Sequence, residues 1–200
     1  QAGEVIVLDA GATYEGSFKL RKKPGNDWIY IESSALDLLP AEGNRVAPQD
    51  EANMPVLEVT VGGTPVVWAE AGAHHYRFTG IKFFTAKENG SGLVRLGYDN
   101  GEWADSFHGI FLEGMHLAVV DSHIDQMKDD GLGDAQAICV NNSPGPFKIV
   151  NNRLEATGEN FLSGGQEPRI DGMIPSDFEF RGNYFFKPDV WNKHSPEYNG

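Results

Sequence analysis

The sequence predicts an all-β fold, a parallel β-solenoid of about five or six coils that contribute strands to three short parallel sheets. Three observations predict it. Apolar residues come in short runs between turn-forming residues, a nine-residue segment recurs along the chain, and Gly, Asn or Asp recurs at one position of that segment. The 200 residues suit one domain with a sizeable core, so we expect a single domain over 1–200.

The short apolar runs indicate strands rather than helices. Val, Ile and Phe are separated by clusters that draw on 24 glycines and 11 prolines, which is typical of short strands joined by turns. The nearest helix candidates, 34–39 and 48–53, are short. In the N-terminal part the expected strands are 4–8, 16–20, 28–33, 56–60 and 66–69.

The recurring segment predicts two strands that meet at a sharp corner. Its four copies are YRFTGIKFF (76–84), LAVVDSHID (117–125), FKIVNNRLE (147–155) and FEFRGNYFF (178–186). The later copies lie roughly 30 residues apart and the first step is longer. The fifth position holds Gly, Asp or Asn, residues that tolerate the left-handed backbone of a tight bend. Stacked coils would place Asn152 beside Asn183 as an amide ladder.

A third strand in each coil is predicted by a second set of related segments. They are 92–97, 109–114, 136–142 and 159–165. One coil cannot bury its own apolar residues, so the coils should stack at about 4.8 Å per coil. A β-sandwich is the alternative fold, although it gives no reason for Gly or Asn at equivalent corners.

The charge of −13 argues against a nucleic-acid partner, because phosphates are bound by Lys and Arg. It is compatible with a neutral sugar or a cation as ligand, and an acidic surface kept for solubility is the alternative. No apolar run is long enough to cross a bilayer, so membrane insertion is not expected. The single cysteine, Cys139, cannot form an internal disulfide.

Several motifs resemble the pectate-lyase-like right-handed parallel β-helix superfamily, and in particular poorly characterised secreted bacterial β-helix proteins. These motifs are GEVIVLDAGATYEGSF (3–18), AGAHHYRFTGIKF (71–83), DAQAICVNNSPGPFKIVNNRLEATGENFLSGG (134–165) and PSDFEFRGNYFFKP (175–188). The resemblance implies a right-handed solenoid, a secreted or cell-surface location and a polysaccharide partner. Because the superfamily includes lyases, hydrolases, tailspikes and non-catalytic adhesins, it leaves open whether the protein is an enzyme.

The resemblance also implies end caps, usually an N-terminal helix and further coils after the Lys187–Pro188 segment. This chain shows neither in its sequence, so both ends would present unpaired strand edges. We therefore expect either a fragment of a longer protein or an assembly unit. In the second case the end coils self-associate or are covered by loops.

In the superfamily, ligands usually lie in a groove whose floor is the sheet of third strands. The resemblance places Leu93, Ile110, Ile138 and Phe161 inward, and Phe111, Glu113, Cys139 and Asn141 outward. Leu93 and Leu96 cannot both point inward under strict alternation, so the direction of Arg95 stays open. The predicted substrate-binding residues are Glu113, Asn141, Trp103, Phe107 and Arg169.

Trp103 and Phe107 lie in YDNGEWADSF (98–107), a loop expected on one groove wall, where they would stack on sugar rings. Aromatic stacking inside the solenoid is the alternative. Arg169, Lys128 and Arg153 are the residues whose type suits the base of a calcium-dependent lyase.

The acidic segment DSHIDQMKDDGLGDAQ (121–136) is the predicted opposite wall. Dense carboxylates bind Ca²⁺, form the acid/base pair of glycoside hydrolysis, or belong to a solvated loop. The candidate catalytic residues here are Asp125, Asp129, Asp130 and Asp134, and the candidate calcium ligands are Asp129, Asp130 and Asp134. The spacing does not match an EF-hand loop.

Glu159 is the last catalytic candidate, because it leads into a floor strand that ends in the bare backbone of Gly164–Gly165. The alternative is that Glu159 and Asn160 only bond backbone groups at a corner. The sequence therefore predicts an extracellular carbohydrate-active protein that binds, and as a lyase or glycoside hydrolase cleaves, a polysaccharide. The alternative is a non-catalytic structural or adhesive β-helix that assembles end to end through uncapped coils.

Overall fold

Strands and turns make up almost all of the computed structural model, which describes residues 3–85, 92–97, 108–128, 134–165, 167 and 171–196. Three short 3₁₀ turns are the helical elements of these residues: η1 (Leu36–Leu38), η2 (Pro48–Asn53) and η3 (Asp189–Trp191). The two short helix candidates thus fall on η1 and η2. No helix in the described part of the chain has the length and apolarity to span a membrane.

The strands of the described residues form three faces, each with six members. Face A consists of β1 (Val5–Leu8), β4 (Ile29–Ser33), β7 (Tyr76–Thr79), β11 (Leu117–Val120), β14 (Phe147–Val150) and β17 (Phe178–Arg181). Face B consists of β2 (Thr13–Glu15), β5 (Val56–Val59), β8 (Lys82–Thr85), β12 (His123–Met127), β15 (Arg153–Ala156) and β18 (Tyr184–Phe186). Face C consists of β3 (Phe18–Leu20), β6 (Val67–Ala69), β9 (Val94–Gly97), β10 (His108–Glu113), β13 (Gln136–Val140) and β16 (Phe161–Ser163).

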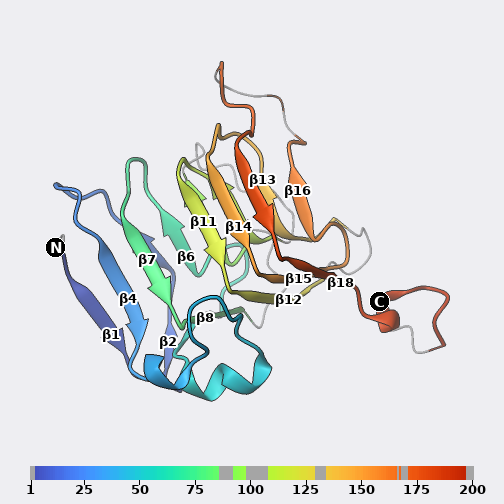
Figure 1. Cartoon of the computed structure of the whole chain (residues 1–200), viewed down its shortest axis with the longest axis horizontal. Coiled ribbons are helices and arrows are strands. Elements are labelled where there is room, and N and C mark those ends of the chain that lie inside the picture. The colour runs from blue at the N-terminus through green and yellow to red at the C-terminus, as the bar shows by residue number, and fades with distance from the viewer. Residues whose placement is uncertain are drawn as a thin grey trace.

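The predicted parallel solenoid is confirmed. Every strand pair described is parallel, and each strand pairs with its counterpart in the neighbouring coil. In Figure 1, strands β1, β4 and β7 lie side by side, followed by β11 and β14, and the two ends of the chain lie at opposite ends of the molecule. The predicted register holds, since Val119, Ile149 and Phe180 are aligned across face A.

The corners between faces A and B use the predicted residue types. Asp121, Asn151 and Gly182 all have positive φ, at 54°, 55° and 66°. Only Gly adopts this left-handed region without a steric penalty, and Asn and Asp do so more readily than other residues. The corner residues therefore allow the chain to turn from one sheet to the next within two residues.

The amide ladder predicted at these corners is also present. Asn152 is fully buried, and its Nδ2 donates to Val119 O at 2.9 Å and to Asn183 Oδ1 at 3.1 Å. Its Oδ1 accepts a bond of 3.0 Å from Ser122 N. Asn183 Nδ2 in turn donates to Ile149 O at 2.8 Å. Each amide thus links its own coil to the preceding one.

The repeat changes phase between β9 and β10. Among the described strands the order is A, B, C up to β9 and C, A, B from β10, so β9 and β10 both belong to face C. Face C is one six-stranded sheet, while faces A and B each split into two three-stranded sheets. Two core clusters result, and Leu96 and Ile110 beneath face C pack against both. The first two copies of the recurring segment are farther apart than the later copies, and the additional strand β10 lies between them.

A segment that we call the corner strap, residues 34–53, connects the two halves on the side where the sheets are split. Gly43 N donates to Asp121 Oδ2 at 2.7 Å, and Val46 N donates to Asp121 O at 3.1 Å. Arg45 Nη2 donates to Asn151 Oδ1 and to Gly182 O, both at 3.0 Å. The strap leaves the second coil and binds three successive corners of the second half.

Candidate functional site

The sheet of third strands predicted as the groove floor exists as face C, and its register settles the direction of Arg95. Val94 pairs with Ile110 and Arg95 with Phe111, while Phe111 pairs on its other side with Cys139. Because Ile110 packs against the core clusters and side chains alternate along a strand, Arg95, Phe111 and Cys139 are on the outward side of the sheet.

The outward residues in the middle of face C are not exposed. Arg95, Phe111 and Cys139 have 5%, 3% and 1% of their surface exposed. Arg95 forms an ion pair with Glu113, with Nη2–Oε2 at 2.9 Å, and its guanidinium carbon lies 4.9 Å from the centre of the Phe111 ring. Glu113, predicted to bind substrate, is therefore the partner of a buried cation.

Two of the predicted catalytic residues, Asp134 and Glu159, come together at the edge of face C where its strands begin. The buried Gln136 donates through Nε2 to Asp134 Oδ1 at 2.8 Å and to Glu159 Oε2 at 2.9 Å. Because both oxygens accept from the same nitrogen, the two carboxylates lie side by side. Both carboxylate residues are exposed. We refer to them as the Asp134–Glu159 pair.

The turn that carries Glu159 is fixed by its neighbours. Asn160 Oδ1 accepts a bond from Ala156 N, and Asn160 Nδ2 donates to Phe186 O, both at 3.1 Å. Lys187 Nζ donates to the carbonyl oxygens of Ala156, Thr157 and Gly158. The corner role expected as an alternative thus belongs to Asn160, whereas the Glu159 carboxylate accepts from a side chain.

His108 is a buried neighbour of the pair. It is the first residue of β10, aligned with Gln136 across face C, and its ring stacks on Phe111 with centroids 4.9 Å apart. Burial lowers the pKa of His108 to about 4, although Asp134 and a hydrogen bond with Gln136 act in the opposite direction. At neutral pH the imidazole beside the pair is uncharged.

The depressed pKa of His108 predicts a loss of stability in acid. The unfolded value is near 6.5, so the unfolded chain binds a proton that the folded chain does not bind until about pH 4. The free energy of unfolding should therefore fall by about 3 kcal/mol between pH 7 and pH 4 because of this residue. We expect urea titrations to show a smaller fall in the His108→Gln variant. An equal fall in the two proteins would contradict the prediction.

Asp125 is not part of the Asp134–Glu159 pair. It lies on β12 in face B, where its Oδ2 is 3.2 Å from His123 Nε2. The adjacent His123 ring is the main cause of the lowered pKa of Asp125. Arg153, aligned with His123 on the next strand, forms an ion pair of 2.8 Å with the buried Glu155. The residues predicted to line one groove are thus distributed over two faces.

The remaining predicted site residues contribute less to this arrangement. Asn141 is buried and accepts a hydrogen bond from Cys139 Sγ at 3.3 Å. Trp103, Phe107, Asp129, Asp130 and Arg169 lie outside the described residues. Within the described ranges, no group of three or more His, Cys, Asp or Glu side chains could hold a metal ion. Calcium binding by Asp129, Asp130 and Asp134 stays a prediction.

Sequence reasoning missed Gln136, the residue that joins the pair. One signal was available, because Gln136 opens the apolar run of β13 two residues after Asp134, in the same phase as the buried Ile138. A buried polar residue needs hydrogen-bond partners, and the adjacent acids supply them.

Comparisons with family models, with curated proteins and with solved structures found no match to this chain. Its demonstrated relationship is one of architecture, that of an all-parallel β protein with stacked parallel sheets.

Proposed function

We propose that this protein is an extracellular carbohydrate-active β-solenoid, related to the pectate-lyase-like superfamily, which cleaves a polysaccharide at the Asp134–Glu159 pair. The observation that carries the proposal is the pair itself, two exposed carboxylates bonded to one buried amide nitrogen. Glycosidases that retain configuration use two carboxyl groups about 5–5.5 Å apart, and those that invert it use about 6.5–9.5 Å. Because the bonded oxygens share one donor nitrogen, the two carboxyl groups are close to each other, which favours a retaining hydrolase.

In this mechanism one carboxyl group protonates the leaving glycosidic oxygen while the other carboxylate attacks the anomeric carbon. Water then cleaves the resulting ester, with the first group acting as base. Gln136 would hold both carboxylates at the required separation, since it donates one N–H to each. The uncharged His108 adds no competing positive charge beside them.

A lyase is supported less well by the described residues. Proton abstraction beside a uronate needs a basic group at the site. Burial lowers the pKa of Lys187, although the Glu159 carboxylate acts in the opposite direction, and its Nζ donates to three backbone carbonyls rather than facing a substrate. Arg153 is on face B in an ion pair with Glu155. If calcium binds, Asp134 would contribute to both the metal and the lyase reaction.

The proposal is tested with a panel of polysaccharides, with and without Ca²⁺, by measuring reducing ends and unsaturated products. Hydrolysis should give reducing ends alone, and the new ends should keep the anomeric configuration. Glu159→Gln and Asp134→Asn should each lower kcat about 10²–10⁴-fold, the range expected for a lost acid or base. Glu42→Gln, which removes an exposed carboxylate from the corner strap, is the control. Unchanged turnover in both site variants would remove the assignment.

A non-catalytic structural or adhesive role is the second candidate. It needs no catalytic carboxylate, and it agrees with the burial of Arg95, Phe111 and Cys139 in the middle of the predicted groove floor. On this reading the wild-type protein would yield no product from any polysaccharide in the panel, while sedimentation with insoluble glycans would still show binding.

A further inference from the structure

We propose that His108 is a positioning residue that fixes the orientation of the Gln136 amide and, through it, the geometry of the Asp134–Glu159 pair. The imidazole donates an N–H to the amide oxygen, so that both amide hydrogens are left for the carboxylates. The consequence for catalysis rests on the proposed function, whereas the consequence for the Gln136 amide is independent of it.

The backbone register of face C places Gln136 between His108 and Glu159. His108 is aligned with Gln136 across β10 and β13. On the other side of β13, Ala137 N donates to Glu159 O at 3.3 Å. A Cβ atom at Gly109 would lie 2.6 Å from Ala137 O, so glycine at this position lets β10 and β13 approach closely beside the two side chains.

The hydrogen-bonding groups of the Gln136 amide leave one role for His108. An amide has two N–H donors and one oxygen acceptor, and both donors are engaged, with Asp134 Oδ1 at 2.8 Å and Glu159 Oε2 at 2.9 Å. The hydrogen bond between His108 and Gln136 therefore uses Oε1 as the acceptor and the imidazole as the donor. No other described residue donates to this oxygen, which is buried and needs a donor.

The opposite orientation of the amide is unfavourable at both of its ends. Half a turn would bring Oε1 to the place of Nε2, where it would face two carboxylate oxygens as a third acceptor. It would also turn Nε2 towards the imidazole N–H, donor against donor. A neutral imidazole has a single N–H, so the same bond selects the tautomer of His108. The two side chains thus hold each other in the arrangement that directs two donors at the pair.

The imidazole ring is itself held in place by its neighbours. It stacks on the Phe111 ring with an angle of 22° between the planes, and the Arg95 guanidinium carbon lies 4.9 Å from the centre of the same Phe111 ring. All three side chains are buried. The stack therefore connects the buried ion pair of face C with the ring that orients Gln136.

The orientation is tested by NMR measurement of hydrogen exchange at the Gln136 side-chain amide. His108→Leu should speed up this exchange about 10-fold, the factor that one hydrogen bond contributes. His108→Asn and His108→Gln supply an N–H near the place of Nδ1 or of Nε2, and at least one of them should keep the wild-type rate. Gln126, whose Nε2 donates to Glu155 Oε1 at 3.2 Å on face B, is the internal reference. Unchanged exchange at Gln136 in His108→Leu would overturn the proposal.

The link to catalysis is tested by a double-mutant cycle on kcat. His108→Leu should lower kcat about 10²-fold, the loss expected when reacting groups are misplaced, and the Asn or Gln variant should recover most of it. In the Gln136→Met background His108→Leu should cause no further loss, because His108 acts through Gln136. If His108→Leu does not fold, as circular dichroism would show, His108→Phe replaces it, since phenylalanine can still stack on Phe111 but has no N–H. Additive losses in the cycle would contradict the positioning role.

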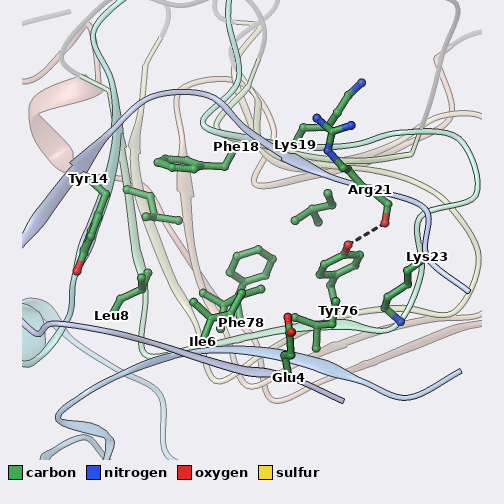
Figure 2. Close-up of a pocket in the computed structure, with 14 residues that line it drawn as sticks. Glu4, Ile6, Leu8, Tyr14, Phe18, Lys19, Arg21, Lys23, Tyr76 and Phe78 are labelled. Atoms are coloured by element: carbon green, nitrogen blue, oxygen red, sulfur yellow. Dashed lines mark hydrogen bonds between the residues drawn. The ribbon is translucent and has the colours of Figure 1, made fainter. Parts of the chain in front are cut away.

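Tyr76→Phe is the control for the loss of one hydrogen bond elsewhere in the chain. The Tyr76 hydroxyl donates to Arg21 O at 2.7 Å in a cavity of about 430 Å³, which Figure 2 shows and which includes no residue of the site. This variant should leave both kcat and the Gln136 amide unchanged. If the wild type cleaved no polysaccharide, the proposed function would fail, and the exchange measurement would still decide the orientation. Faster exchange with unchanged kcat would uphold the orientation and overturn its role in catalysis.

Discussion

Replacing Asn152 with alanine is expected to lower the free energy of unfolding by about 3–5 kcal/mol. The side chain is fully buried and satisfies Ser122 N, Val119 O and Asn183 Oδ1 at the corner between faces A and B. Each buried polar group left without a partner costs about 1–3 kcal/mol. Water cannot replace the amide without opening the corner, so the effect should be among the largest of any single substitution.

Urea unfolding followed by circular dichroism measures this effect. Asn44→Ala is the matched control, because Asn44 is exposed and its amide donates only to Ala41 O within the corner strap, at 3.3 Å. That change should stay within about 0.5 kcal/mol. Equal unfolding midpoints for the two variants would mean that the amide ladder does not stabilise the stack.

The buried ion pair on the outward side of face C gives the second large effect. Arg95→Met leaves the Glu113 carboxylate buried without its cation, which should cost about 3–5 kcal/mol. The double variant Arg95→Met, Glu113→Leu should recover most of this loss, because buried ion pairs are often replaced by apolar pairs at little cost. A double-mutant cycle from urea unfolding measures the coupling.

A second ion pair of the same chain provides the comparison. Arg181 and Glu179 are 2.9 Å apart, with side chains 68% and 46% exposed. Arg181→Met should change the free energy of unfolding by about 1 kcal/mol or less, because exposed pairs are solvated and screened. If Arg95→Met lowered the free energy of unfolding by no more than Arg181→Met, the inference that burial makes the loss of Arg95 costly would be wrong.

The solenoid could be predicted from the sequence because its determinants are local. The corner residues Asp121, Asn151 and Gly182 mark bends that most residue types avoid, and their regular spacing indicates stacking. The phase change between β9 and β10 was not predicted. A strand of face C has the same alternation of inward and outward residues whether the strands follow the order A, B, C or the order C, A, B. The corner strap was not predicted. Arg45 donates to the side chain of Asn151, which is distant in sequence, and to the backbone carbonyl of Gly182, and a backbone carbonyl has no sequence signature.

The candidate site was predicted in part. Asp134 and Glu159 were proposed independently of each other. Each was chosen for its residue type and for its place before a strand of the groove floor. Their association depends on Gln136, a residue not singled out in the sequence, which donates to both carboxylates. Asp125 was assigned to the same groove because it is close to Asp134 in sequence, but it lies on β12 in face B, whereas Asp134 precedes β13 in face C. The direction of Arg95 required the register with Phe111.

The junction between β9 and β10 has a consequence for the cooperativity of unfolding. In stacked-coil proteins the stability is the sum of a contribution from each coil and a coupling free energy between neighbours. Elsewhere in the stack three paired sheets contribute to that coupling, whereas at this junction face C is the one sheet that continues among the described residues. The two halves are therefore two potential folding units, and the hydrogen bonds of Gly43, Arg45 and Val46 supply thermodynamic linkage where faces A and B do not.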